Sequence, residues 1–450
     1  MKTKKLLATA LAGLIVVAGA AGCAGRDNMS DIKPPVYEKG KEFMIGAWDS
    51  PMETRADYQL AKDMGLTHMF VDYGGLAGQS VRGSKGFLEL LELMDELGLK
   101  AFLRTPAGVF EEALQEETDY SKYPAVAAIN WRDEPYYADL PNMARAAERH
   151  MELYPDNSPA FFVNHNPYYE ETGDHNNVIF GGLTWEEFLE YYIETVCSKI
   201  TAGRNILSYD YYPLMAQRGI YRMRTSWLPS IATLTKLAKE HDMDTHVFIQ
   251  ATKHFEYYPE MTTEDLRFQF AVYMAFGISN FSYFQYCDSA AANFDEGMVE
   301  RYVSASPRPL YYRAQTVNME LKALQHIYLS FDYLGTMPVR GDDWAEQEIF
   351  YRQNMIFEGI ESIPFIKEVS AEHNAIIGQF KDKKNDIDGL MVTNFTQPYD
   401  GLFNTVKIKF DNAKKVAVYT KGTEKIYVLK DNVFEYKLEA GQGAFMIPLA

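Results

Sequence analysis

The chain has 450 residues, of which 47% are hydrophobic and 24% are charged, and its formal net charge at pH 7 is −18. This apolar content can build large packed cores, which excludes a wholly disordered chain. The acidic excess excludes nucleic acid as an expected partner, because the phosphate backbone carries the same sign of charge. No period of about 20 to 50 residues repeats along the chain, which excludes solenoids and propellers.

The N-terminal segment has the pattern of an export signal. Three lysines within the first five residues precede an apolar stretch over residues 6–17 and a run of small residues that ends at Cys23. Basic, apolar and small residues in this order are typical of secretory signals. We therefore predict a signal peptide over residues 1–22 and a polar tether over residues 23–40.

Patterns typical of strands and of helices alternate from residue 41 to residue 334. Short apolar, β-branched or aromatic runs are each followed by a helical pattern, such as residues 262–276, which open with a capping-box spacing. Eight such units match a (β/α)8 barrel, and the lack of a glycine-rich loop after the first strand excludes a dinucleotide-binding fold. The predicted strands cover residues 43–48, 68–72, 101–104, 127–131, 160–164, 206–209, 246–250 and 280–286.

From residue 335 to residue 450 the pattern changes to alternating strands separated by turn residues. This texture predicts a small antiparallel β-sandwich after the barrel. Its predicted strands cover residues 374–380, 388–394, 405–410, 415–419, 425–429, 433–438 and 443–449.

Polar and aromatic residues gather just past the ends of the predicted barrel strands. The carboxyl ends of barrel strands share one face, which holds the active site in barrel enzymes. Such residues suit a carbohydrate substrate, whose hydroxyl groups hydrogen-bond polar side chains and whose C–H faces stack on rings. We expect one cavity to receive the side chains of Asp49, Glu134, Asn164, Asp210, Gln250 and Gln285. Further candidates for contact with the substrate are Trp48, Asp72, Tyr73, Asp133, Tyr211, Tyr212, Tyr283 and Tyr286.

Two carboxylates in this set suit the cleavage of a glycosidic bond. One carboxylic acid must protonate the leaving oxygen, while a second carboxylate attacks or activates the nucleophile. We predict Glu134 as the general acid, Asp210 as the second carboxylate and Asp133 as a residue that orients or polarises the substrate. Paired histidine spacings typical of metal sites are absent from the sequence, so neither a metal nor another cofactor is expected.

The motifs Trp-Arg-Asp-Glu-Pro at residues 131–135 and Tyr-Asp-Tyr-Tyr-Pro at residues 209–213 resemble those of barrel glycoside hydrolases, often lipoproteins, of gut Bacteroidota. The end of the signal segment is also similar to a bacterial lipobox. These resemblances imply a carbohydrate substrate, acylation of Cys23, and export to the outer membrane, on either its periplasmic or its outer side. The oligomeric state stays open.

Two departures keep alternatives open. Retaining barrel enzymes with glutamates on strands four and seven usually have asparagine where this chain has Asp133, and a nucleophilic glutamate where it has Gln250. The pair Asp133-Glu134 is similar to that of hexosaminidases that use the substrate's acetamido group as the nucleophile, where Tyr211 or Tyr283 would hold the acetamido oxygen. A third alternative is a glycan-binding lipoprotein without turnover.

Overall fold

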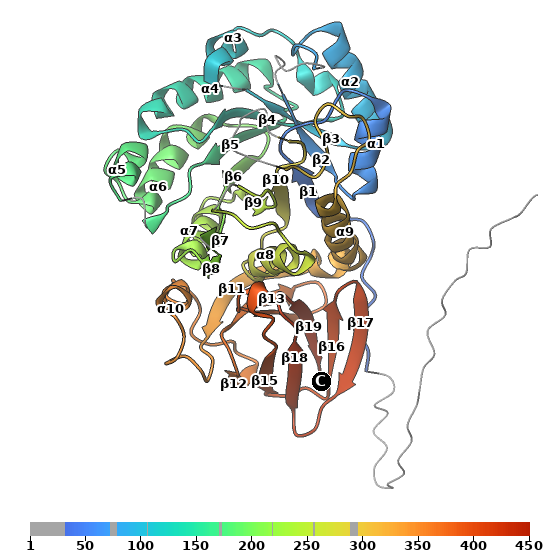
Figure 1. Cartoon of the computed structure of the whole chain (residues 1–450), viewed down its shortest axis with the longest axis vertical. Coiled ribbons are helices and arrows are strands. Elements are labelled where there is room, and N and C mark those ends of the chain that lie inside the picture. The colour runs from blue at the N-terminus through green and yellow to red at the C-terminus, as the bar shows by residue number, and fades with distance from the viewer. Residues whose placement is uncertain are drawn as a thin grey trace, which may run out of the picture. The chain divides into compact units, whose positions relative to one another are not determined.

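The computed structural model describes residues 32–72, 79–105, 107–170, 173–217, 219–254, 257–288 and 296–450 (Figure 1). The predicted signal peptide, Cys23, the first part of the predicted tether and Tyr73 lie outside these residues. The expectations placed on them stay predictions.

Eight parallel strands form one sheet that closes on itself. The strand order is β1-β10-β9-β6-β5-β4-β3-β2. The two end strands meet where the backbone N–H of Thr67 donates to the carbonyl of Ile45 at 2.7 Å. The strands are β1 (Met44–Ala47), β2 (His68–Val71), β3 (Lys100–Arg104), β4 (Val126–Asp133), β5 (Ala160–His165), β6 (Asn205–Tyr209), β9 (Asp244–Gln250) and β10 (Asn280–Phe284). The predicted barrel and its eight strands are confirmed.

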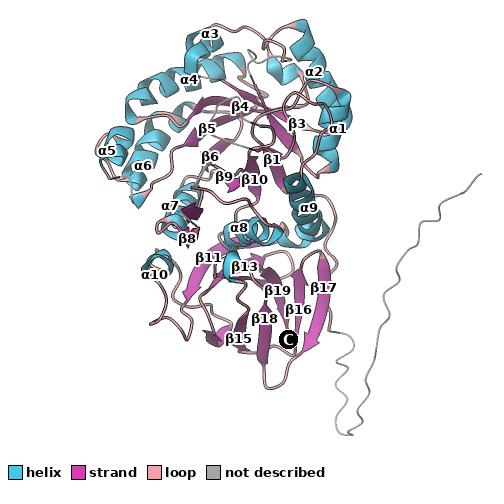
Figure 2. Cartoon of the chain, in the orientation of Figure 1, coloured by secondary structure: helices cyan, strands magenta, loops and turns pink. Residues whose placement is uncertain are grey.

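Helices surround this sheet, as the cyan ribbons in Figure 2 show. They are α1 (Arg55–Asp63), α2 (Lys85–Leu97), α3 (Phe110–Leu114), α4 (Leu140–Leu153), α5 (Asp174–Phe180), α6 (Trp185–Thr195), α7 (Trp227–Glu240), α8 (Thr263–Ala275) and α9 (Pro309–Tyr328). The predicted capping box before α8 is present, since Thr262 and Asp265 exchange hydrogen bonds. Among the described helices, none combines the length and the apolar character needed to cross a bilayer.

Two antiparallel sheets follow the barrel. The larger has the order β11-β13-β14-β19-β16-β17 and the smaller the order β12-β15-β18, and apolar side chains from both form one core. Their strands are β11 (Asp332–Val339), β12 (Ile366–Ala371), β13 (Ala375–Asp382), β14 (Ile387–Asn394), β15 (Asn404–Phe410), β16 (Lys415–Thr420), β17 (Thr423–Val428), β18 (Val433–Leu438) and β19 (Gly443–Leu449). The predicted β-sandwich is therefore confirmed.

Three features of the fold were not predicted from the sequence. Strand β11 contains Gly335 and Pro338, which interrupt a strand pattern, and strand β12 is mostly exposed, so neither shows a clear apolar alternation. The third feature is a hairpin of β7 (Leu214–Gln217) and β8 (Ile220–Met223), inserted after the sixth barrel strand. A short helix, α10 (Ile349–Asn354), lies against β8.

Helix α8 packs against both the barrel and the larger C-terminal sheet. The hydroxyl group of Thr393 on β14 donates to the carbonyl of Ala271 at 3.1 Å. Gly378 lets β13 approach closely, because a Cβ atom there would lie 2.2 Å from the carbonyl oxygen of Ala275. Most residues of α8 are buried, on every side of the helix, which is typical of a helix enclosed by protein. Figure 1 shows α8 between the barrel strands and the C-terminal strands.

The barrel interior contains an aromatic layer with a polar group inside it. Phe70, Phe102, Phe162 and Phe248 form an apolar cluster. The imidazole of His68 stacks on Phe102 with ring centroids 4.4 Å apart. Gly46 on β1 leaves the space for this imidazole, since a Cβ atom at Gly46 would lie 2.1 Å from His68 Nε2.

We expect Gly46→Ala to lower the free energy of unfolding by about 1–3 kcal/mol, because the added methyl group overpacks the barrel against the His68 ring. Chemical denaturation followed by near-UV circular dichroism measures the change. Gly40→Ala is the matched control, since a Cβ atom at Gly40 meets nothing within 4 Å. Equal stability of the two variants would contradict the packing argument.

Candidate active site

A pocket of about 240 Å³ opens at the carboxyl ends of the barrel strands. Its volume is close to the lower end of the range of about 300–1,000 Å³ that is usual for small-molecule sites. The pocket is lined by Trp48, Asp133, Glu134, Asn164, Asp210, Tyr212, Phe248 and Phe284. Six of these were among the predicted site residues, so the structure brings together the three predicted acids, one amide and two of the predicted rings.

Glu134 stands on a turn that is fixed from both sides. Its own backbone N–H donates to the carbonyl of Asn164 at 2.8 Å, and Asn166 Nδ2 donates to the carbonyl of Glu134 at 3.0 Å. Its φ of 48° lies in the left-handed region, which is unfavourable for a residue with a side chain. Strain of this kind is held in place by surrounding contacts and concentrates at functional positions. The turn leaves Glu134 exposed at the pocket mouth.

Asn164 joins two of the three carboxylates. Its Nδ2 atom donates to Asp133 Oδ1 at 3.2 Å and to Asp210 Oδ1 at 3.1 Å. The two aspartates come from the ends of β4 and β6, and Asn164 lies on β5 between them. Parallel neighbouring strands therefore place a single amide group where it contacts both acids.

The pKa values of all three acids are raised, chiefly by the removal of water from their carboxylates. The pKa of Glu134 is well above the usual range because surrounding protein removes water from its carboxylate, and because Asp210 and Asp133 repel its charge. Since Glu134 is exposed at the mouth, solvent screens part of this effect. Burial, followed by repulsion from Asp133, raises the pKa of Asp210 to about 7. Loss of water also raises the pKa of Asp133, against the attraction of Arg104. Asp133 is exposed like Glu134, so solvent screens part of this effect too.

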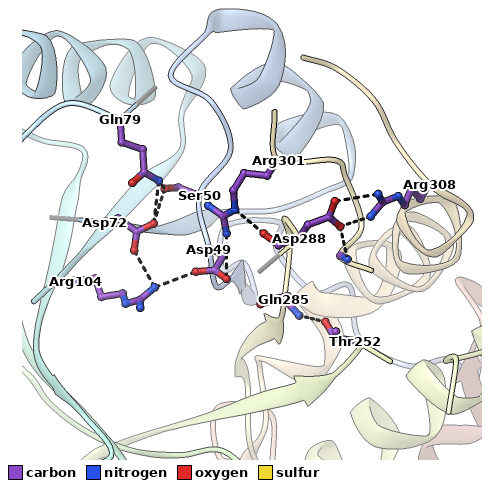
Figure 3. Close-up of polar contacts among 11 residues, drawn as sticks. Asp49, Ser50, Asp72, Gln79, Arg104, Thr252, Gln285, Asp288, Arg301 and Arg308 are labelled. Atoms are coloured by element: carbon purple, nitrogen blue, oxygen red, sulfur yellow. Dashed lines mark hydrogen bonds and ion pairs between the residues drawn. The ribbon is translucent and has the colours of Figure 1, made fainter. Parts of the chain in front are cut away.

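An ion-pair network lies beside the pocket (Figure 3). Arg104 donates from one nitrogen to Asp49 at 3.0 Å and to Asp72 at 2.8 Å. Its guanidinium group also lies 4.2 Å from the ring centroid of Trp48, which lines the pocket. Arg301 approaches the other oxygen of Asp49 at 3.3 Å. Asp49 and Asp72 are thus held in ion pairs within the protein. Contrary to the prediction, they do not line the pocket.

Sequence analysis missed Arg104, although a signal was present. The residue ends the third barrel strand, and the carboxyl ends of the barrel strands share one face. Acids, amides and rings are the residue types that suit a sugar, so a basic residue at this strand end did not match the expected pattern. Its charge attracts that of Asp133, so it belongs to the electrostatic environment of the pocket.

Tyr211 and Tyr283, which were predicted to contact the substrate, do not line the pocket. Both side chains are fully buried outside the pocket. The hydroxyl group of Tyr211 lies 2.9 Å from that of Ser226, and the hydroxyl group of Tyr283 donates to Asn318 of α9 at 2.8 Å. Successive strand residues point to opposite sides, so the inward position belongs to Phe284 rather than Tyr283, and to Asp210 rather than Tyr211.

The prediction that Gln250 and Gln285 open onto the common cavity is wrong, since both are buried and do not line the pocket. Tyr286, predicted to contact the substrate, is also buried and away from the pocket lining. The carboxamide of Gln250 accepts from the backbone N–H of Leu214 at 2.9 Å and donates to its carbonyl at 2.7 Å. Gln250 therefore anchors the start of the β7–β8 hairpin. The backbone N–H of Gln285 donates to Thr252 Oγ1 at 2.7 Å, as Figure 3 shows.

The fold and the pocket define a (β/α)8 barrel protein with a carboxylate-rich pocket on the face where barrel enzymes have their active sites. In the part of the chain that the structure describes, no three His, Cys, Asp or Glu side chains are grouped to hold a metal ion.

Comparison with known proteins gives a likeness of fold. No protein-family model matches the chain, and no curated protein matches its sequence. A Bacteroides fragilis protein with a provisional alpha-galactosidase assignment has a similar structure over 91% of this chain and 79% of its own, with a TM-score of 0.50 and 11% identity. A GH30 endoxylanase from Clostridium papyrosolvens is matched over 92% of this chain and 98% of its own, with a TM-score of 0.44 and 11% identity. The first likeness extends over the barrel and most of the C-terminal sheets.

We expect Arg104→Met to lower the free energy of unfolding at pH 7 by about 1.5–3 kcal/mol, because it leaves Asp49 and Asp72 without their shared donor. The loss should shrink as the pH falls. Burial raises the pKa of Asp49, so this group takes up a proton in acid and then needs the cation less. Denaturant titrations at pH 7 and pH 4.5 measure both values.

Arg145→Met is the control for loss of an arginine, since the ion pair of Arg145 with Glu111 is exposed and should contribute little. A loss for Arg104→Met that is equally large at both pH values would contradict the assignment to carboxylate pairing.

Proposed function

We propose that this chain is a glycoside hydrolase that cleaves O-glycosidic bonds in a neutral oligosaccharide or polysaccharide. The observation that carries the proposal is the cluster of Asp133, Glu134 and Asp210 in an aromatic-walled pocket at the carboxyl ends of the barrel strands. Glycosidic cleavage needs two carboxyl groups in different protonation states. The similar fold of a protein assigned as an alpha-galactosidase supports the same class of reaction.

The two catalytic roles follow from the electrostatics of the pocket. Glu134 is the general acid, because its pKa is raised well above the usual range and its protonated form is thereby favoured. Asp210, with a pKa of about 7, is the second carboxylate, since a substantial fraction is ionised at that pH. As the bond between the anomeric carbon and the leaving oxygen breaks, Glu134 gives its proton to that oxygen. Asp210 then attacks the anomeric carbon, or takes a proton from the water that does so.

Asp133 supports this pair. It shares the amide of Asn164 with Asp210, and Arg104 attracts its negative charge. An anionic Asp133 stabilises the positive charge that develops on the sugar ring in the transition state. Trp48 and Tyr212 supply ring faces for the C–H groups of the sugar.

The carboxylates also favour a neutral substrate. Three acids line one small pocket, and the neighbouring Arg104 is already paired with Asp49 and Asp72. An anionic sugar would be repelled from such a surface. With export and acylation at Cys23, which the sequence predicts, the enzyme would meet its substrate at the outer membrane.

Glu134→Gln should lower kcat by about 100-fold or more on a glycoside with a poor leaving group, because general acid assistance is typically worth 10²–10⁴-fold. Binding of the substrate should largely survive. The measurement is a screen of wild type and variant against aryl glycosides and intact polysaccharides, with product release followed by chromatography.

Glu117→Gln, in an exposed stretch before β4, is the control and should behave as wild type. Near wild-type turnover by Glu134→Gln on a natural glycan would remove Glu134 from the mechanism. Binding of glycans by wild-type protein without any turnover would favour a glycan-binding lipoprotein instead.

We expect turnover not to require a 2-acetamido group on the sugar, because Asp210 is placed to serve as the second carboxylate. The tyrosines expected to hold an acetamido oxygen, Tyr211 and Tyr283, are engaged elsewhere. Paired substrates with and without this group, with the anomer of the first product read by NMR, test the point. Strict dependence on the acetamido group, with full activity of Asp210→Asn, would support substrate assistance by Asp133-Glu134.

A further inference from the structure

A chain of buried hydrogen bonds runs through the barrel to the pocket. Ser208 Oγ donates to Asn164 Oδ1 at 2.9 Å and lies 2.9 Å from His246 Nδ1. Ser282 Oγ lies 2.9 Å from His246 Nε2 and 2.9 Å from His68 Nε2. All five side chains are at most 2% exposed. The chain crosses the barrel interior from β2 through β10, β9 and β6 to β5.

Both histidines in this chain are neutral. Burial lowers the pKa of His68 to about 3 and takes the pKa of His246 well below its usual value. The surroundings are aromatic, since the His246 ring lies 5.1 Å from the rings of both Phe162 and Phe248. Each imidazole therefore carries one N–H donor and one acceptor nitrogen.

The single proton on each group gives the chain one direction. Because the Ser208 hydroxyl proton goes to Asn164, Ser208 must accept from His246 Nδ1–H. His246 Nε2 then accepts from the hydroxyl group of Ser282, which in turn accepts from His68 Nε2–H. At the far end, His68 Nδ1 lies 3.3 Å from Thr67 Oγ1, and this hydroxyl group also donates to the carbonyl of Ile45 at 3.2 Å.

The two carboxylates that contact Asn164 determine how its carboxamide is held. Its oxygen faces the Ser208 donor, so its amino group faces Asp133 and Asp210. The flipped carboxamide would place Oδ1 against two carboxylate oxygens. Repulsion between these oxygens therefore favours the observed orientation.

We propose that Ser208 and His246 are positioning residues, which hold the Asn164 carboxamide with its amino group toward Asp133 and Asp210 and thereby favour the ionised form of Asp210. Neither residue lines the pocket, and each acts through Asn164. The consequence for catalysis rests on the proposed glycosidase function, whereas the orientation of the amide does not.

Several other groups face Asp210, and the proposal takes them into account. Asp133 and Glu134 come from the end of β4, Tyr212 follows β6, Tyr169 follows β5, and Tyr273 lies on α8. Asp133 raises the pKa of Asp210, while the hydrogen bonds from Tyr212 and Asn164 lower it. Losing the Asn164 contribution alone should therefore raise this pKa further.

The first test uses no substrate. In protein labelled with ¹³C at the aspartate carboxyl carbon, the Asp210 resonance is assigned with Asp210→Asn and followed with pH. Ser208→Ala should raise the titration midpoint of Asp210 by about 0.5 to 1 pH unit, the worth of one hydrogen bond to a charged group that is partly lost. Ser208→Thr, which keeps the hydroxyl group, should restore the wild-type midpoint.

Ser230→Ala is the matched control, because Ser230 is a buried hydroxyl on α7 that donates to a helix carbonyl away from the pocket. It should leave the midpoint unchanged. An unchanged midpoint in Ser208→Ala, or an equal change in Ser230→Ala, would overturn the proposal. Wild-type protein supplies a further measurement if Ser208→Ala fails to fold. The ¹⁵N side-chain resonance of Asn164 should shift as Asp210 titrates, and a flat pH response would also overturn it.

The kinetic test separates this proposal from the proposed function. Near pH 6, Ser208→Ala should lower kcat/KM by about three- to tenfold, as the shifted ionisation of Asp210 requires, and near pH 8 most of the loss should disappear. General structural damage would lower the rate at both pH values and would count against the proposal. If the NMR midpoint moves as expected while wild type cleaves no glycoside, the amide orientation stands and the glycosidase function fails.

Discussion

Three carboxylates share one small pocket, and their mutual repulsion is the constraint on which the rest of the site depends. For the proposed reaction, a fully protonated site would lack its base, and a fully ionised site would lack its acid. The protein stabilises the three carboxylates unequally. One amide contacts Asp133 and Asp210, and Arg104 attracts Asp133, so the repulsion falls most heavily on Glu134 at the mouth. Such separation of pKa values is how paired carboxyl groups acquire different roles.

The barrel wall supplies this unequal support through its geometry. Neighbouring parallel strands bring Asp133 and Asp210 within hydrogen-bond reach of Asn164, although the two acids lie 77 positions apart in the chain. Beneath them, phenylalanine rings exclude water and keep two imidazoles neutral. Because these imidazoles are neutral, each has one donor and one acceptor nitrogen in the chain of buried hydrogen bonds from His68 to Asn164. Packing and electrostatics are not independent in this barrel.

Much of the fold could be predicted from the sequence, because each barrel strand is a short apolar run followed by a helical pattern. The acids of the pocket were also accessible, since Asp133, Glu134 and Asp210 come directly after buried strands. Errors arose where a single residue decides the side of a strand, as for Tyr283 and Phe284. Gln250 was misjudged because its partner, Leu214, belongs to a hairpin whose strands are only four residues long.

Other parts depend on contacts that have no local pattern. Arg104 meets Asp49 across 55 residues of chain, and His68 meets Ser282 across 214. Nothing in the sequence near a buried serine or histidine shows which distant partner it will find. Strands β11 and β12 were missed for a different reason, since glycine, proline and charged residues conceal their alternation.

Helix α8 has a consequence for how the two parts of the chain depend on each other. An ordinary barrel helix turns a polar side to water, but this one is covered on its outer side by β13, β14 and β19 and carries apolar residues there too. Without the C-terminal sheets, Phe268 and its neighbours would form an exposed apolar patch on the barrel wall. This patch would lie on the helix that follows the loop after β9. The sandwich is therefore a fixed part of the barrel's outer layer, and neither part is a detachable module that evolution or an engineer could exchange without rebuilding this helix.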